Sequence, residues 1–321
     1  MTHDTLAPTT PADRSQFAED VAYYLSLTPR QLPSHYLYDD LGSALFEAIC
    51  RLPWYRIARL ENELLRTRGN DIFRRLEGLS TLVELGPGNG DKLATLLQAE
   101  SRGPMMVHLV DISPHALSAA VSTLSETRDL TVVTHQGTYE SGFIDAMKHR
   151  QGTGRALVLF LGSNIGNFDP PGDDAFLSGI RAALMPGDAI LLGADLVKPE
   201  RDLVDAYDDP LGVTAAFNKN LLVRANRELA ADFDISRFAH RAAWNGERSR
   251  VEMHLVSTSQ QRVRVPAARL DITFEAGETI WTESSYKYQP DGVLAMLERA
   301  RFAALDQWVA DGFALTLATA T

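Results

Sequence analysis

From about residue 79, short apolar runs alternate along the chain with longer segments that mix apolar and polar positions. The apolar runs are expected to be strands, and they are Thr81 to Leu85, Met105 to Val110, Leu130 to Thr134, Ala156 to Leu161 and Ala189 to Gly193. Short, largely apolar strands are typical of a parallel sheet covered on both faces. The segments between them are expected to be helices, at Asp91 to Ala99, Pro114 to Glu126, Gly142 to His149 and Asp173 to Leu184. The pattern predicts a doubly wound α/β sheet.

The C-terminal segment predicts how this sheet ends. A helix is expected from Asp291 to Ala300, and two apolar runs follow it, Phe302 to Val309 and Phe313 to Thr319. The turn pair Asp311-Gly312 separates the two runs, which indicates an antiparallel hairpin. A parallel sheet that ends on a reversed strand is a feature of class I S-adenosylmethionine-dependent methyltransferases, and the sheet is therefore expected to be Rossmann-like.

A large insertion, about Val197 to Tyr288, precedes the last helix. It is expected to begin with helices at Arg201 to Tyr207 and Val213 to Glu228. Asn245-Gly246 then lies between two strand-like runs, a strong hairpin signal. Strands around Arg262 to Val265 and Leu270 to Phe274 are expected to continue that sheet.

These elements predict two lobes. Residues 17–60 and 197–286 are expected to form a substrate-binding lobe, because neither segment fits the repeating strand and helix pattern. Residues 61–196 and 287–321 are expected to form the methyltransferase domain that binds the cofactor. Residues 1–16 are expected to be disordered or loosely attached.

Composition narrows the choice of partners. The 321 residues include 31 basic and 42 acidic side chains, and the net charge of −11 disfavours binding to nucleic acid. With Cys50 as its single cysteine, the chain has neither an internal disulfide nor a cysteine-based zinc site. No apolar run approaches the roughly 20 residues of a membrane span, and the N-terminus lacks the regions of a secretion signal. We expect a cytoplasmic monomer that acts on a small molecule without a metal ion.

The most informative short stretch is ELGPGNG, residues 84–90. Its glycines, Gly86, Gly88 and Gly90, lie at alternate positions, unlike the G-x-G-x-x-G spacing that binds a dinucleotide. Glu84 precedes them, and a carboxylate there would repel a diphosphate but attract the cationic amino-acid end of S-adenosylmethionine. Spacing and charge both favour the sulfonium cofactor.

Four other residues at the carboxyl edge of the predicted sheet suit the same ligand. Asp111 ends the second strand and can accept hydrogen bonds from ribose hydroxyls, a role shared with nicotinamide cofactors. Lys92 begins the helix after the glycine loop and can bind the cofactor carboxylate, although a solvated lysine is as good an interpretation. After the third strand, Thr138 can accept a hydrogen bond from adenine, and Tyr139 can lie against the ring.

The loop after the fourth strand, residues 162–167, is where such enzymes bring the methyl donor and the nucleophile together. It contains Asn164 and Asn167. Either asparagine alone is typical of a turn, and only the position in the loop favours function.

Several longer motifs resemble one family. They are YLYDDLGSALFEAI (36–49), LPWY (52–55), ELGPGNGDK (84–92), FLGSNIGNF (160–168), GADLVK (193–198), AYDDPLGVTAAFN (206–218), NRELAADFD (226–234), VEMHL (251–255) and TESSYKY (282–288). Together they are similar to the histidine N-alpha-methyltransferases of ergothioneine biosynthesis. The resemblance runs from about Leu32 to the C-terminus, and its motifs outside the glycine loop are the more specific ones.

The resemblance implies a role for each matching residue. The cofactor contacts it implies are Tyr38, Gly86, Gly88, Lys92, Asp111, Thr138 and Tyr139. The substrate contacts it implies are Tyr55, Asn164, Asn167, Tyr207, Met253, Glu283 and Ser285. Tyr55, Asn167 and Tyr207 would hold the substrate carboxylate and orient the amine, whose site Tyr38 would shape. Thr138 stands where the family usually has aspartate, and Asn164 where threonine is common.

The substrate implied by the resemblance is L-histidine, trimethylated on its α-nitrogen to hercynine. Glu283 and Ser285 suit an imidazole, since a carboxylate and a hydroxyl can satisfy both ring nitrogens while Met253 shapes the pocket. An indole would leave the carboxylate poorly paired, at a cost of about 1–3 kcal/mol.

Three alternatives stay open. The same fold can methylate another amino acid or an indole amine, which changes at Glu283 or Met253 would favour. A regulatory protein that binds S-adenosylmethionine without turnover would also keep Glu84, Gly86 and Asp111. A nicotinamide oxidoreductase is the weakest alternative, because the glycine spacing disfavours it.

Overall fold

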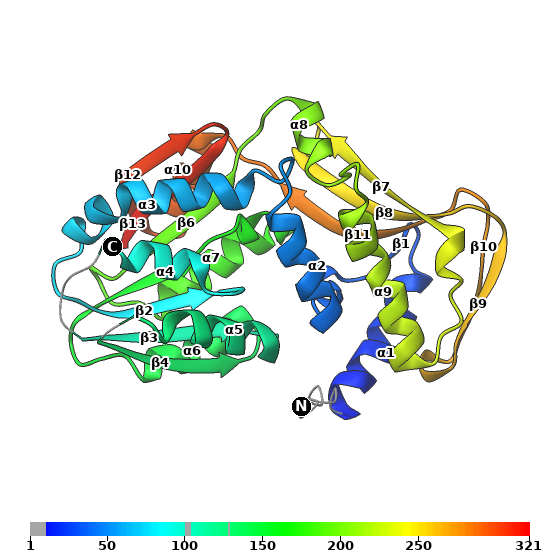
Figure 1. Cartoon of the computed structure of the whole chain (residues 1–321), viewed down its shortest axis with the longest axis horizontal. Coiled ribbons are helices and arrows are strands. Elements are labelled where there is room, and N and C mark those ends of the chain that lie inside the picture. Colours follow the sequence, from blue (N-terminus) through cyan, green and yellow to red (C-terminus); the bar gives the residue numbers. More distant parts are fainter. Residues whose placement is uncertain (1–10, 100–103, 128) are drawn as a thin grey trace. The chain divides into compact units, whose positions relative to one another are not determined.

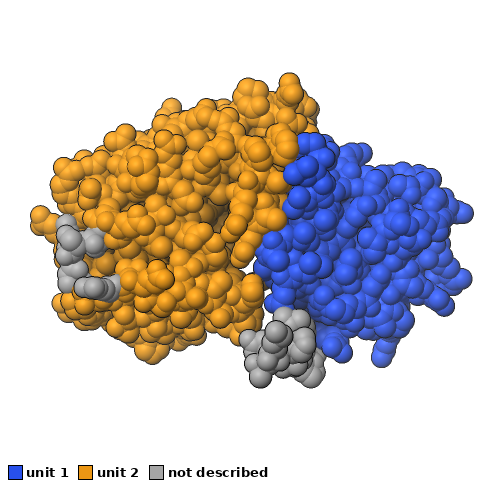
Figure 2. Space-filling model, viewed as in Figure 1, with its two compact units in different colours: residues 1–45, 208–243, 252–283 blue, residues 46–207, 244–251, 284–321 orange. Residues whose placement is uncertain are grey.

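The computed structural model describes residues 11–99, 104–127 and 129–321. The chain divides into two compact units, which Figure 2 colours separately. Unit 1 comprises residues 1–45, 208–243 and 252–283, and unit 2 comprises residues 46–207, 244–251 and 284–321. Each unit is described by itself.

Unit 2 contains a sheet in the order β12-β13-β6-β5-β2-β3-β4 (Figure 1). Its strands are β2 (Leu79–Leu85), β3 (Met105–Asp111), β4 (Leu130–Gln136), β5 (Arg155–Phe160), β6 (Ala189–Asp195), β12 (Phe302–Ala310) and β13 (Phe313–Ala320). The five strands β2 to β6 run parallel to one another. Strand β13 lies between β6 and β12 and is antiparallel to both. The predicted class I sheet with its terminal hairpin is confirmed.

Helices cover both faces of this sheet. They are α3 (Ile57–Arg75), α4 (Asp91–Leu97), α5 (Pro114–Leu124), α6 (Tyr139–Lys148), α7 (Gly172–Ala182) and α10 (Pro290–Arg299). The short helix α8 (Glu200–Asp205) follows β6 in the same unit. The neighbours α3, α4 and α5 form one layer, and α6, α7 and α10 form another. Apolar side chains of α6, α7 and α10 pack with those of the strands in one buried cluster. The helices predicted from the alternating pattern are confirmed, with ends that differ by a few residues.

Local chemistry explains where two of these helices begin. Ser113 caps α5 by accepting a hydrogen bond from the backbone N–H of Ala116, and Pro114 occupies the first turn, where its missing N–H costs nothing. Thr138 caps α6 in the same way by accepting from Ser141. Each cap lies two residues after the end of a strand, so the carboxyl edge of the sheet is also the edge at which these helices start.

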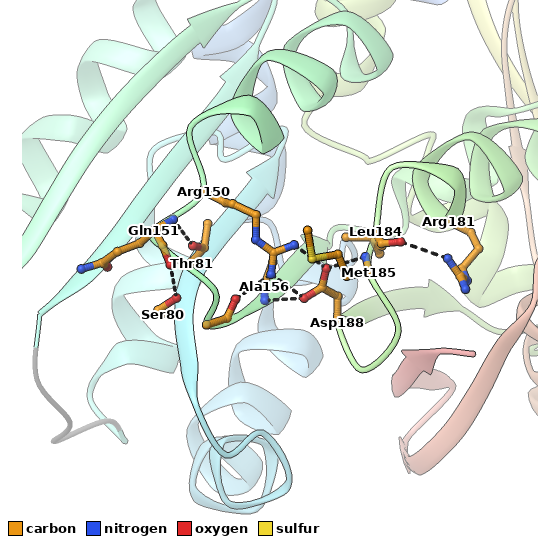
Figure 3. A network of polar contacts seen from close by, with 10 residues as sticks. Ser80, Thr81, Arg150, Gln151, Ala156, Arg181, Leu184, Met185 and Asp188 are labelled. Atoms are coloured by element: carbon orange, nitrogen blue, oxygen red, sulfur yellow. Dashed lines mark hydrogen bonds and ion pairs between the residues drawn. The ribbon is translucent and has the colours of Figure 1, made fainter.

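A buried ion pair joins segments of unit 2 at the opposite edge of the sheet (Figure 3). The guanidinium of Arg150 donates to both carboxylate oxygens of Asp188, at 2.9 and 3.0 Å. Asp188 also accepts from the backbone N–H groups of Ala156 and Met185, each at 2.8 Å. One carboxylate therefore ties the starts of β5 and β6 to the segment after α6.

Unit 1 is built around α1 (Pro11–Ser26) and α9 (Val213–Leu229), with short 3-10 helices η1 (Ser34–Leu37), η3 (Ile235–Arg237) and η4 (Pro266–Ala268). Helix α2 (Asp40–Cys50) crosses the division between the units. Asp209 begins α9 by accepting hydrogen bonds from the backbone N–H groups of Leu211, Val213 and Thr214. These hydrogen bonds outweigh burial and lower the pKa of Asp209.

Two sheets accompany these helices. The larger has the order β1-β11-β8-β7, formed by β1 (Arg30–Gln31), β7 (Phe238–Asn245), β8 (Arg250–Ser257) and β11 (Thr279–Tyr286). Strands β7 and β8 are joined by residues 246–249, a loop longer than the two-residue turn that Asn245-Gly246 by itself favours. Here Asn245 accepts a hydrogen bond from the backbone of Arg248.

One expectation about this region is wrong. Strands β9 (Gln261–Val265) and β10 (Leu270–Phe274) do not continue the larger sheet but pair with each other in a two-stranded sheet of their own. The tight η4 connection turns the chain back at once, so the nearest partner for β9 is β10. Arg262 and Asp271 form an ion pair across that hairpin.

The boundaries of the two units differ from those expected for the two lobes. Helix α3 packs against α4 and β13, so the chain enters unit 2 at residue 46 rather than 61. Helix α8 also belongs to unit 2, which extends to residue 207 rather than 196. Residues 11–16, within the segment expected to be loose, lie in α1, and residues 1–10 lie outside the described residues. In the described part of the chain, no helix is long and apolar enough to cross a membrane.

Candidate active site

The glycine loop follows β2 at the carboxyl edge of the sheet in unit 2. Gly86 and Gly88 have φ angles of +74° and +56°, a region that side chains rarely adopt. A Cβ at Gly86 would lie 3.0 Å from both the Asn164 amide nitrogen and the Tyr139 hydroxyl, so the loop passes close to these two side chains. A Cβ at Gly88 would meet no atom within 4 Å, and a ligand can therefore approach the backbone there.

Glu84 lies directly before this loop and is 1% exposed. Neither of its carboxylate oxygens has a hydrogen-bond partner among the described residues. Burial raises the pKa of Glu84 to about 8, against the opposing charge of Lys92 and with support from the charges of Glu61 and Asp111. A buried acid without a partner fits a cationic ligand, which would supply the missing hydrogen bonds.

Lys92 lies in the first turn of α4 and forms an ion pair with Glu61, at 2.7 Å. Both oxygens of Glu61 also accept from the backbone N–H of Gly162 at 2.8 Å. Burial lowers the pKa of Lys92, but Glu61 more than offsets this and the pKa is raised. Because a lysine ammonium has three donors, the ion pair leaves capacity for a ligand carboxylate.

Glu61 is a site residue that sequence reasoning missed. It is fully buried on α3, in line with the buried Ile57 and Leu65. A carboxylate that lies four residues from an apolar residue on either side is on the apolar face of a helix. This spacing could have indicated from the sequence that Glu61 is buried. Gly193 makes room for it, since a Cβ there would lie 2.0 Å from a Glu61 oxygen.

Asp111 ends β3 beside the glycine loop, and the backbone N–H of Gly86 donates to the carbonyl of Val110 at 2.8 Å. One carboxylate oxygen of Asp111 accepts from the backbone N–H of Ser113 at 2.8 Å. Burial raises the pKa of Asp111 to about 6, although backbone hydrogen bonds from Ser113 and Ile112 oppose the shift. The position suits the ribose contact predicted for it.

Thr138 and Tyr139 follow β4. The Thr138 hydroxyl accepts from the backbone N–H of Ser141 at 3.3 Å, as the cap of α6. The Tyr139 ring packs edge-on against Phe160 and Phe176, with centroids 5.3 and 6.1 Å away. Tyr139 thus belongs to the core beneath the glycine loop, with its hydroxyl end near Gly86.

The loop after β5 carries the two predicted asparagines on η2 (Asn164–Asn167). Asn164 is partly buried and reaches the glycine loop at Gly86, whereas Asn167 is exposed. A Cβ at Gly166 would lie 2.6 Å from the carbonyl oxygen of Tyr286, so this loop packs closely on the end of β11.

A buried polar network lies at the same end of β11. The Tyr207 hydroxyl donates to the Ser285 hydroxyl at 2.8 Å. The Lys287 ammonium donates to both hydroxyl oxygens, at 2.8 Å to Tyr207 and 2.9 Å to Ser285. Lys287 also forms an ion pair with Asp195 at 3.0 Å, and Asp195 binds Lys198 through its other oxygen.

Sequence reasoning missed Lys287 and Asp195, although both lie in motifs that carried the resemblance. Lys287 could have been found from its position in the sequence. It follows Glu283 and Ser285 at alternate positions along β11 and its continuation, so the three side chains are expected on one face. Asp195 ends β6, at the same sheet edge as Asp111.

The other predicted substrate residues lie as follows. Tyr55 is buried in unit 2, edge-on to Tyr207 with the centroids 6.2 Å apart. In unit 1, Tyr38 follows η1 and packs edge-on against Phe217, 5.5 Å between centroids. Met253 is buried on β8, and its carbonyl accepts from the Thr282 hydroxyl at 3.0 Å.

Glu283 is half-buried on β11, two residues before Ser285. Its backbone carbonyl accepts from the Trp281 indole at 2.9 Å. Because side chains alternate along a strand, Glu283 and Ser285 leave β11 on the same face. The structure therefore brings Gly86, Asn164 and Tyr139 together, and separately Tyr55, Tyr207 and Ser285.

One surface cavity lies apart from these groups. A surface cavity of about 590 Å³ between α3 and α4 is lined by Asn62, Glu63, Arg66, Asp91, Ala94, Thr95 and Gln98, none of them a predicted site residue. Across the described ranges, no three His, Cys, Asp or Glu side chains are grouped to hold a metal ion.

Comparison with known proteins adds the family context. The profile of a family described as "Histidine-specific methyltransferase, SAM-dependent" matches residues 17–320. The chain is 41% identical to a histidine N-alpha-methyltransferase of Mycolicibacterium smegmatis, over 93% of each protein. It is 26% identical to ergothioneine biosynthesis protein 1 of Neurospora crassa, over 86% of this chain and 34% of that protein. It is also 26% identical to a 4-dimethylallyltryptophan N-methyltransferase of Penicillium roqueforti, over 92% and 90%.

Proposed function

Because the chain belongs to the family of histidine-specific, S-adenosylmethionine-dependent methyltransferases, we propose that it methylates the α-nitrogen of L-histidine. The product is the trimethylated betaine hercynine, and the reaction is a step of ergothioneine biosynthesis. The main support for histidine as the substrate is the extent of the family match. Residues 17–320 cover both compact units and not the donor-binding sheet alone.

The residues at the carboxyl edge of the sheet fit the methyl donor. S-adenosylmethionine supplies a methyl group on a positively charged sulfur. Glu84 is the partner for its α-ammonium group, because this buried acid lacks one. Gly88 allows close approach of the ligand to the backbone, and Asp111 binds the ribose hydroxyls. Lys92, held in place by Glu61, binds the donor's carboxylate.

Three further residues are proposed to contact S-adenosylmethionine or to lie beside the reacting amine. Thr138 accepts from the adenine amino group in place of the usual aspartate, and Tyr139, whose hydroxyl end is near Gly86, lies against the adenine ring. Tyr38 shapes the site of the reacting amine.

For the substrate, we assign Tyr55 and Asn167 to the carboxylate of histidine. Tyr207, also expected there, donates its one hydroxyl proton to Ser285, and we assign it to the support of the ring site. Glu283 and Ser285 bind the imidazole ring, and Met253 forms part of its pocket. Asn164, which reaches the glycine loop, lies where the reacting amine meets the donor. Residues 208–243 and 252–283 of unit 1, with its N-terminal segment, serve as the substrate-binding lobe.

These residues act mainly by alignment. Attack by a neutral amine on a cationic sulfur disperses existing charge, so no leaving group needs stabilisation by a protein cation. The amine loses a proton before each transfer, and water or a weak acceptor suffices for this step. We assign no general base.

The protein is further proposed to act as a monomer in the cytoplasm on a small molecule. Its net charge of −11 supports a partner other than nucleic acid.

A panel of amino acids tests the substrate. Purified protein is incubated with S-adenosylmethionine and each standard amino acid, and products are followed by mass spectrometry. We expect L-histidine to gain up to three methyl groups at its α-nitrogen, with S-adenosylhomocysteine formed in step. Equal turnover of tryptophan or tyrosine would contradict histidine as the specific substrate. The absence of turnover with every amino acid would contradict the proposed amino-acid methyltransferase activity.

A second candidate substrate is an indole amine, because a relative of similar coverage is a 4-dimethylallyltryptophan N-methyltransferase. Glu283 discriminates between the two. Glu283→Ala removes an acceptor for a ring N–H, so kcat/KM for histidine is expected to fall by roughly 10- to 100-fold. The ratio of tryptophan to histidine turnover is expected to rise. An unchanged ratio would remove Glu283 from substrate selection.

A further inference from the structure

We propose that Lys287 orients the hydroxyl groups of Ser285 and Tyr207 so that the imidazole ring of the substrate is bound in its neutral form. This inference rests on the proposed function, since it concerns how the same site accepts the ring of histidine. It assigns Lys287 the role of a positioning residue, which acts on the ring through Ser285.

The first argument is burial. The side chain of Lys287 is 0% exposed, and Ser285 and Tyr207 are also buried. A buried ammonium needs a partner for each donor, and Lys287 has three: Tyr207 at 2.8 Å, Ser285 at 2.9 Å and Asp195 at 3.0 Å. Its three N–H groups are fully used, so it has little freedom to turn.

The second argument is the direction of the hydrogen bonds at Ser285. A hydroxyl oxygen has two lone pairs and one proton. Ser285 accepts one hydrogen bond from Tyr207 and one from Lys287, which fills both lone pairs. The proton of Ser285 is then what it can offer to a ligand. A ring nitrogen that faces Ser285 must therefore accept, which requires that this nitrogen carry no proton.

The third argument is charge. Two buried or largely buried ammonium groups, Lys287 and Lys198, share the single carboxylate of Asp195, which leaves a net charge of +1. The ionisable groups that act on Lys287 are Tyr207 and Asp195. Burial alone would lower the pKa of Lys287, but these two neighbours raise it, so the ammonium stays charged at neutral pH.

This positive charge disfavours an imidazolium at Ser285. Glu283, two residues earlier on β11, acts in the opposite direction, since a carboxylate attracts a protonated ring. The two requirements are met together by the neutral tautomer. One nitrogen donates its proton to Glu283, and the other accepts from Ser285.

The test compares two ligands whose rings differ in basicity. Histidine takes up a ring proton near pH 6.5, whereas 1,2,4-triazol-3-ylalanine stays neutral through this range. Dissociation constants are measured by calorimetry between pH 5.5 and 7.5 in the presence of S-adenosylhomocysteine. Because both ligands meet the same protein groups, the ratio of their dissociation constants isolates the effect of the ring proton.

For the unaltered protein, the ratio of histidine to triazole dissociation constants is expected to rise as the pH falls, approaching tenfold per pH unit below about 6.5. In Lys287→Met, Ser285 regains a lone pair and the local charge falls, so the ratio is expected to become nearly independent of pH. Lys287→Gln is the second variant if Lys287→Met does not fold. Glutamine has two N–H donors, but its side chain is one bond shorter than that of lysine and carries no charge. It therefore does not replace the ammonium at both hydroxyls, and its ratio is expected to flatten as well.

Lys198→Met is the matched control. It removes the same charge and an ion pair with the same Asp195, but Lys198 binds the carboxylate oxygen that Lys287 does not use. Because both lone pairs of Ser285 stay filled in this variant, it is expected to keep most of the steep pH dependence and to lose only the part due to net charge. A steep ratio in Lys287→Met would overturn the inference, and so would equal flattening in both lysine variants, which would assign the effect to charge alone.

Two further outcomes separate this inference from the proposed function. A ratio independent of pH in the unaltered protein, with histidine still bound and methylated, would overturn the role of Lys287 alone. Failure of histidine to bind at any pH would overturn both the inference and the proposed substrate.

Discussion

At the scale of single residues, the clearest indicator of the donor site is a polar group with nothing to bind. Glu84 is buried without a hydrogen-bond partner for either oxygen, an arrangement that costs free energy unless a ligand completes it. Sequence reasoning placed a carboxylate there, but burial and the missing partners became visible only in the structure. The contacts of Glu61 and Lys287 also became visible only in the structure, because they join segments far apart in the chain.

Ligand binding at Glu84 is predicted to release a proton. With its pKa raised to about 8, Glu84 is mostly protonated at pH 7. The α-ammonium of S-adenosylhomocysteine favours the ionised form, so binding lowers this pKa and close to one proton leaves. Calorimetry in buffers of different ionisation enthalpy measures the number released. Glu84→Gln is the control, and an equal proton release in that variant would assign it to another group.

At the scale of elements, one ion pair holds the amino-terminal ends of β5 and β6. Removing one partner of a buried pair leaves the other charge without compensation, at about 3–5 kcal/mol. Asp188→Asn is therefore predicted to lower the free energy of unfolding by about 3 kcal/mol or more, measured by urea denaturation. Asp188 also accepts two backbone N–H groups, which adds to the effect.

The matched control for Asp188 is an exposed ion pair in the same unit. Asp174 binds Arg299 with both side chains substantially exposed, and such pairs contribute about 0–1 kcal/mol. Asp174→Asn should change the free energy of unfolding by no more than that. Equal losses in the two variants would show that Asp188 is no more important than a surface carboxylate.

The neighbouring strands β3 and β4 predict a pH dependence of stability. His108 on β3 is fully buried, and its ring nitrogen lies 2.9 Å from that of His135 on β4. Burial and the neighbouring His135 lower the pKa of His108 to about 4. In the unfolded chain the ring protonates near pH 6.5, whereas the folded protein keeps it neutral. Its contribution is present above pH 6.5 and is lost as the pH falls from about 6.5 to about 4.

This dependence is measured as the free energy of unfolding at a series of pH values. His108→Gln is expected to show a shallower decline between pH 6.5 and about 4 than the unaltered protein. His115→Gln, at an exposed position on α5, should leave the decline unchanged. If the two variants declined alike, His108 would not be the group responsible.

At the scale of the whole molecule, the two units differ in how well sequence patterns predict them. The sheet of unit 2 follows from apolar runs and intervening helices, and its strands and terminal hairpin were predicted within a few residues. The fold of the insertion was harder to predict, because the sequence of a short strand does not indicate which strand it pairs with. The β9-β10 hairpin was assigned to the wrong sheet for this reason, and the division of the chain depends on packing of α3 and α8.

The chain's sequence by itself determined the class I sheet, the glycine loop with its acid, and the motifs that resemble the histidine-specific family. These are local patterns, in which residue spacing alone reports strand, turn or ligand chemistry. Only the tertiary structure decided which buried charges meet, as in Glu61 with Lys92 and Lys287 with Asp195. Burial in a low-dielectric interior and the geometry of hydrogen bonds depend on segments that the fold brings together, and spacing along the chain does not contain them.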